Sequence, residues 1–108
     1  MQSEKLKLMG FDESLRGTVY IDAALRIIEN GKSIRIMDLY AKLASEFGTN
    51  PDNISSGIRY AIKRWWVIAP ESLMKKHFPM NCNLGIPPTN KAFLAYVANE
   101  NVNAFKRE

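Results

Sequence analysis

The feature that most constrains this chain is a pair of amphipathic segments joined by three residues, within residues 36–66. In the first segment, residues 36–47, apolar side chains recur at the spacing of one helix face, at positions 36, 39, 40, 43, 44 and 47. Gly48 follows where a helix end favours a left-handed residue, and Asn50 is a suitable cap for the next helix, which has a proline in its first turn. The second helix is predicted over about residues 51–66. Two helices joined by so short a glycine-containing turn are typical of the helix-turn-helix motif that binds DNA.

The second predicted helix has two distinct faces at about 100° per residue. One face should pack on the core and carries Ile54, Ile58, Ala61 and Trp65, with Gly57 and Ile62 at its edges. A glycine in a helix interior costs up to about 1 kcal/mol relative to alanine, so Gly57 predicts that another helix crosses closely at this point. The opposite face collects Asp52, Ser56, Arg59, Tyr60 and Lys63, with Ser55 and Trp66 at its flanks.

The outer face of this helix carries the chemistry that DNA recognition needs. Arginine can donate two parallel hydrogen bonds to guanine, and serine hydroxyls can donate or accept at base edges. The predicted base-reading residues are Ser55, Ser56, Arg59 and Tyr60. The predicted phosphate-binding residues are Arg35, Lys42, Lys63 and Arg64. Since basic outer faces are also common in helical bundles, an ordinary solvated surface stays open as an alternative.

The rest of the chain predicts an all-α protein of six helices. Four further helices are expected at about residues 3–9, 17–30 and 70–78 and from Thr89 onward, fraying beyond Asn101. The second of the six has apolar rows that run from Val19 and from Tyr20, and Asn30-Gly31 forms its predicted C-cap. Residues 79–88 are rich in helix breakers and are predicted to form a loop.

Composition limits the class of protein. The chain has 108 residues, enough for one domain over residues 1–108, and a formal net charge of +4. Residues 31–66 hold six basic and three acidic side chains, whereas residues 1–30 hold four and five. The only cysteine is Cys82 and no apolar run is long enough to span a bilayer, so a cytoplasmic protein without membrane contact is expected.

No catalytic constellation, cofactor motif or metal-ligand set is present in the sequence. His77 is the only histidine, and it has no serine or aspartate spaced to build a triad. One histidine and one cysteine are a poor supply of metal ligands. The sequence therefore predicts no enzyme, cofactor or metal.

Several blocks of the sequence together resemble one family. The pattern Leu39-Tyr40-x-x-Leu43-Ala44-x-x-Phe47-Gly48-Thr49 is followed by Ile54-Ser55-Ser56-Gly57-Ile58-Arg59-Tyr60-Ala61-Ile62-Lys63 and Trp66. Two outer blocks agree: Gly17-Thr18-Val19-Tyr20-Ile21, and the fairly specific Pro88-Thr89-Asn90 before Phe93-Leu94. In this order they resemble the C-terminal DNA-binding domain of the stage-zero master regulator of sporulation, over nearly the whole chain.

The resemblance implies a compact, winged-helix-like bundle of six helices that binds double-stranded DNA and regulates transcription. It also implies tandem or dimeric binding on repeated boxes, which includes a homodimer on DNA, and a surface for RNA polymerase or a related regulator. Arg59 matches a family arginine that reads bases, whereas Tyr60 stands where the family has a histidine. Ser55 and Ser56 replace a Glu-Arg pair, so the target box is expected to differ or binding to be less specific. Residues 70–87, near the family's polymerase-facing surface, diverge as well.

Two alternatives stay open. The first is a protein-interaction module that keeps the fold but antagonises or partners a related regulator without reading DNA; Ser55, Ser56 and the modest charge favour it. The second is a structural domain of a larger regulator. The family's phosphoreceiver domain is absent from this chain, and Met1 slightly favours a stand-alone regulator.

Overall fold

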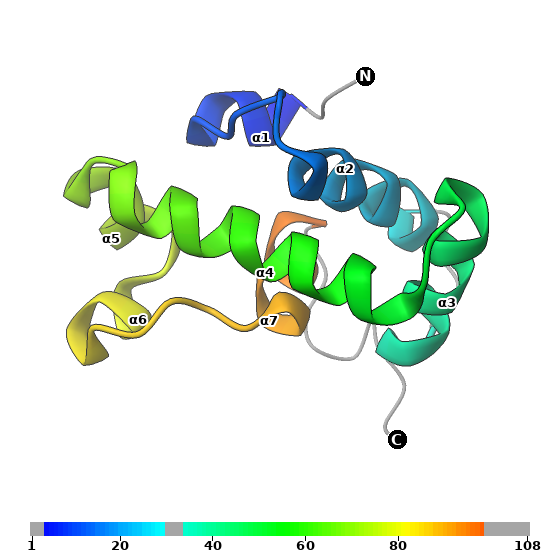
Figure 1. Cartoon of the computed structure of the whole chain (residues 1–108). Coiled ribbons are helices and arrows are strands. Elements are labelled where there is room, and N and C mark those ends of the chain that lie inside the picture. The colour runs from blue at the N-terminus through cyan, green and yellow to red at the C-terminus, as the bar shows by residue number, and fades with distance from the viewer. Residues whose placement is uncertain (1–3, 30–33, 99–108) are drawn as a thin grey trace.

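The computed structural model describes residues 4–29 and 34–98, which form helices and no β-strand. The helices are α1 (Glu4–Met9), α2 (Arg16–Glu29), α3 (Ile36–Phe47), α4 (Pro51–Ile68), α5 (Glu71–His77), α6 (Pro79–Leu84) and α7 (Asn90–Val97). In Figure 1, α4 runs through the middle of the molecule. The helices α1 and α2 lie on one side of it and α7 on the other, with α3 at one end and α5 and α6 at the opposite end. The all-α prediction is confirmed for the described residues.

The connection between α3 and α4 is the tight turn that the sequence predicts. Gly48 has φ 66° and ψ 39°, in the left-handed region, and its N–H donates to the carbonyl of Ala44. Asn50 then caps α4, because its side-chain oxygen accepts from the backbone N–H of Asn53 at 2.8 Å. Pro51 takes the first helical position, where no backbone donor is needed. These local features explain why α3 ends and α4 begins within three residues.

The helix α2 crosses α4 closely, as Gly57 predicts. A methyl group on Gly57 would lie 3.0 Å from the ring of Tyr20 and 3.8 Å from the Cα of Gly17, both in α2. The predicted core face of α4 is confirmed, since Ile54, Ile58, Ala61, Ile62 and Trp65 are all buried. The outer face of α4 is consequently turned away from α2, α3 and α7.

Trp65 is the centre of an aromatic cluster that joins four parts of the fold. Its ring stacks on Phe11 at a centroid distance of 5.4 Å and packs edge-on against Phe78 and Phe93, both at 6.1 Å. Its indole N–H donates to the carbonyl of Met9 at 2.7 Å. Because each aromatic pair adds about 0.5–1.5 kcal/mol beyond area burial, this cluster anchors the far half of α4.

The predictions of six helices and of a loop over residues 79–88 are wrong. The described residues form seven helices, because α6 occupies the first part of that segment. Pro79 stands at the first position of α6, and Gly85, with φ 69° and ψ 25°, closes it with a left-handed cap. A proline ends the preceding helix and also suits a helix start, so the same residue signals both.

Two smaller differences concern helix faces and bounds. Val19, on a predicted apolar row of α2, is 42% exposed, whereas the row that runs from Tyr20 is buried. The helix α4 continues two residues beyond Trp66, to Ile68. The predicted cap at Asn30-Gly31 and the fraying beyond Asn101 lie outside the described residues. Within the part of the chain that the structure describes, none of the helices combines the length and apolarity required to cross a membrane.

Candidate nucleic-acid interface

The outward face of α4 carries exposed polar and basic side chains over about two turns. Ser56, Arg59, Tyr60 and Lys63 are exposed, and Tyr60 keeps 58% of its surface accessible. They share this face because the opposite positions are held in the core. Ser55 differs from the other predicted base readers, since it is half-buried at the edge of this face. The structure therefore brings three of the four predicted base readers onto one accessible surface.

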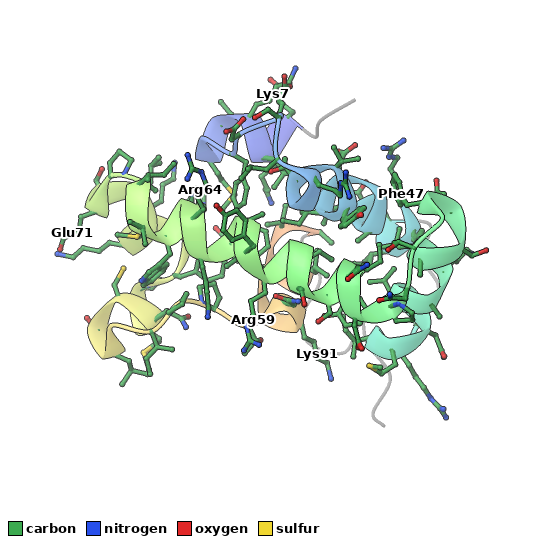
Figure 2. All side chains as sticks on the ribbon, in the orientation of Figure 1. Lys7, Phe47, Arg59, Arg64, Glu71 and Lys91 are labelled. Atoms are coloured by element: carbon green, nitrogen blue, oxygen red, sulfur yellow. The ribbon has the colours of Figure 1, made fainter. Side chains whose placement is uncertain are left out.

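The two arginines of α4 lie on different flanks of the outward face. Figure 2 shows Arg64 pointing toward the connection between α1 and α2, whereas Arg59 points toward the side where Lys91 of α7 lies. Arg64 lines a small depression together with Phe11 and Asp12. The charge of Arg64 also contributes, after the hydrogen bonds from Ser14, to a lowered pKa of Asp12. Arg64 therefore adds positive charge on the opposite flank from Arg59.

The two predicted phosphate ligands outside α4, Arg35 and Lys42, belong to α3 and its N-cap. Arg35 is exposed and occupies the N-cap position of α3, where its side chain makes no capping hydrogen bond. Lys42 is exposed on α3, whose Leu39 and Leu43 are buried. Arg59 and Lys63 line a groove between α4 and the start of α7, and neither Arg35 nor Lys42 lines it.

A groove of about 560 Å³ runs along the Arg59 flank of α4. Its sides come from α3, from α4 and from the segment 86–91, which includes the start of α7. The cationic side chains that line it are Arg59, Lys63 and Lys91. No acidic residue is among the described residues that line it. The sequence predictions did not include this groove or Lys91, because the segment 86–91 is distant from α4 along the chain.

Asn90 joins three helices at the groove. Its side-chain amide donates to the hydroxyl of Tyr40 at 3.1 Å and to the backbone carbonyl of Ser55 at 3.0 Å. Thr89 caps α7 by accepting from the N–H of Ala92 at 3.1 Å. The Pro88-Thr89-Asn90 block therefore has a structural role, since it sets the start of α7 against α3 and α4. Within this block, only Thr89, as a helix-capping residue, allows the start of α7 to be predicted from the sequence.

A separate polar contact connects α5 to α7, away from the groove. His77 Nδ1 lies 2.6 Å from the hydroxyl oxygen of Tyr96, and the two rings meet edge-on. Burial lowers the pKa of His77, and the nearby charges of Lys76 and Lys5 lower it further. A neutral Nδ1 without a proton accepts from the Tyr96 hydroxyl, so the contact matches the unprotonated ring.

The all-helical architecture, with a basic and polar outer face on α4, is the arrangement expected of a DNA-binding domain. Residues 3–100 match the family model described as sporulation initiation factor Spo0A C terminal. The chain belongs to this family of DNA-binding regulators of sporulation, which confirms the family expected from the sequence. No curated protein and no solved structure matches the chain.

Proposed function

We propose that this chain is a transcriptional-regulator domain that reads a short DNA box through the major groove with α4. The observation that carries the proposal is the arrangement of α4 itself. Its inner face is fixed by buried Ile54, Ile58 and Trp65, while Arg59 and Tyr60 stand exposed on the outer face. A rigid helix with exposed hydrogen-bonding side chains can enter a groove without rearranging the core. Family membership supports DNA as the partner.

The side chains of the outer face have separate roles in the proposed complex. Arg59 donates two hydrogen bonds to a guanine, and Ser56 and Tyr60 contact neighbouring base edges or phosphates. Ser55 contributes less than the other three predicted base readers, because it is half-buried at the edge of the face. Lys63 binds a phosphate beside the groove. Arg35 and Lys42 add phosphate contacts from α3 where the duplex passes that helix.

The departures from the family pattern bear on specificity. With serines at 55 and 56, Arg59 is the only arginine on the first three turns of α4. Each well-placed bidentate contact contributes about 1–3 kcal/mol of discrimination between bases. We therefore infer a box whose strongest preference is one guanine. The predicted contacts with RNA polymerase or a related regulator, and the predicted pairing of two copies on DNA, stay predictions.

A selection of bound duplexes from a random pool tests this proposal. It is carried out at about 50 and 150 mM salt, because non-specific binding fades steeply with ionic strength. The wild-type chain should enrich a short motif containing a guanine, and Arg59→Ala should lose that enrichment while binding unselected DNA nearly as well. Binding that salt abolishes without any enriched motif would contradict the proposal and favour the protein-interaction module.

A further inference from the structure

The groove beside Arg59 combines features that suit a sugar–phosphate chain. Its volume of about 560 Å³ lies within the range of clefts that hold ligands, roughly 300–1,000 Å³. Ile86 and Pro87 provide apolar lining, while Lys91 provides a cation on the α7 side. A deoxyribose ring has apolar faces and its linking phosphate is anionic. The mixed lining therefore matches both parts of one repeating unit of a DNA strand.

The positive charges of the groove come from two helices. Arg59 and Lys63 belong to α4, whereas Lys91 belongs to the first turn of α7, and Figure 2 shows Arg59 and Lys91 extending on the same side of the molecule. None of the described lining residues is acidic, so the charged side chains that line the groove are all basic. Each phosphate neutralised by such a cation releases condensed counterions, which favours binding. The groove therefore extends the basic lining from the outer face of α4 to the start of α7.

Asn90 holds the two sides of the groove in a fixed relation. Both donors of its amide are used, one by the Tyr40 hydroxyl and one by the Ser55 carbonyl. These bonds tie the residue next to Lys91 to the turn of α4 that precedes Arg59. A cation on a rigid element loses less freedom on binding than one on a mobile loop. Asn90 is therefore a positioning residue for the α7 side of the groove.

We propose that this groove seats the backbone of the DNA strand that flanks the bases read by α4, with Lys91 binding one of its phosphates. This inference rests on the proposed function and extends the contact surface from α4 to α7. It makes a specific geometric claim. The phosphate that Lys91 binds lies beside the guanine that Arg59 reads, on the flank opposite Arg64.

The first test is the salt dependence of binding to the selected box. Lys91→Gln should lower the slope of log K against log salt by about 0.9 and weaken binding to the box and to an unrelated duplex by a similar factor. Lys76→Gln is the matched control, because Lys76 is exposed on α5 and outside the groove, and its slope should equal that of the wild type. Equal slopes for Lys91→Gln and the wild type would overturn the proposal.

The second test locates the phosphate. Each phosphate around the box is replaced in turn by an uncharged methylphosphonate, and binding of the wild type and of Lys91→Gln is compared. At one flanking position, the replacement should weaken the wild type about tenfold or less and leave Lys91→Gln unaffected, as expected when both changes remove the same contact. If every replacement weakens both proteins equally, Lys91 binds no phosphate.

Asn90→Ala tests the positioning role. At the phosphate found above, the variant should lose most of the coupling to Lys91, whereas discrimination of the guanine by Arg59 should persist. Persistence of that discrimination shows that the variant is folded, which separates a positioning effect from unfolding. If the coupling to Lys91 is unchanged, Asn90 has no positioning role. If the coupling and the guanine discrimination are lost together, Asn90 acts only in folding, and the positioning role is contradicted as well.

The two proposals fail in different ways. If the wild type binds its box through Arg59 while Lys91→Gln behaves like Lys76→Gln, only the groove assignment is overturned. If the wild type selects no duplex at all, both proposals are overturned together.

Discussion

Gly17 of α2 lies so close to Gly57 of α4 that a methyl group on Gly17 would come under 3.0 Å from the Gly57 carbonyl oxygen. The two backbones meet at the point where α2 supports the first half of α4, which carries Ser56 and Arg59. The close approach explains why α4 tolerates a glycine in its interior. It also makes the position of the outer face dependent on two residues without side chains.

The first prediction compares alanine at these two positions. Gly17→Ala should lower the free energy of unfolding by about 1–3 kcal/mol or more, because backbone atoms of α4 cannot move aside easily. Gly57→Ala should cost much less, since its methyl group meets only the ring of Tyr20 at 3.0 Å and alanine favours the helix by up to about 1 kcal/mol. Urea unfolding measures both. A larger loss for Gly57→Ala than for Gly17→Ala would contradict the packing described.

The second prediction separates the two basic residues Lys63 and Arg64. Lys63→Gln should lower the salt slope of DNA binding by about 0.9, because Lys63 lines the groove beside Arg59. Arg64→Gln should lower it less, since Arg64 lies on the other flank and interacts electrostatically with Asp12. Fluorescence titrations at several salt concentrations give both slopes. Equal reductions would place both flanks of α4 on the duplex.

The third prediction uses the neighbouring tryptophans as a matched pair. Trp65→Phe should lower the free energy of unfolding by about 2–4 kcal/mol, because it leaves a void in the aromatic cluster and removes the 2.7 Å hydrogen bond to the Met9 carbonyl. Trp66→Phe should cost less, since Trp66 is only half-buried. Thermal and denaturant unfolding compare the two variants, and comparable losses would count against Trp65 as the centre of the core.

The fourth prediction concerns His77, whose signal is easily assigned because the chain has one histidine. Burial and two nearby lysines lower its pKa in the folded chain. The unfolded chain, with a histidine pKa of about 6.5, therefore binds the proton more tightly. The contribution of His77 to the free energy of unfolding is fully present above about pH 6.5 and is lost as the pH falls toward the lower pKa of the folded chain. His77→Gln should make the free energy of unfolding less dependent on pH below about 6.5, as measured by urea unfolding at several pH values.

NMR titration of His77 checks the premise directly. A midpoint below about 6.5 is expected, and Tyr96→Phe should change it because the hydroxyl next to Nδ1 is removed. A midpoint at or above the ordinary value would contradict the lowered pKa.

Local rules in the sequence determined the part of the fold that carries the outer face of α4. Gly48, Asn50 and Pro51 act through the backbone of their own neighbourhood, so a helix end, a cap and a helix start could be predicted in place. The burial of one side of α4 follows from apolar periodicity, which needs no knowledge of the partner helix. Arg59 and Lys63 could therefore be placed outside from sequence alone.

Tertiary structure decided what surrounds that face. Pro79 is compatible with both a helix end and a helix start, and only the folded chain shows that α6 begins there. The groove depends on Asn90 meeting Tyr40 and Ser55, which are 50 and 35 residues away along the chain. A side-chain amide carries no periodic signal for such partners. Whether Lys91 stands near Arg59, and whether Ser55 is open or half-buried, is set by how α7 packs on α4, because these distances depend on contacts between segments and not on local conformation.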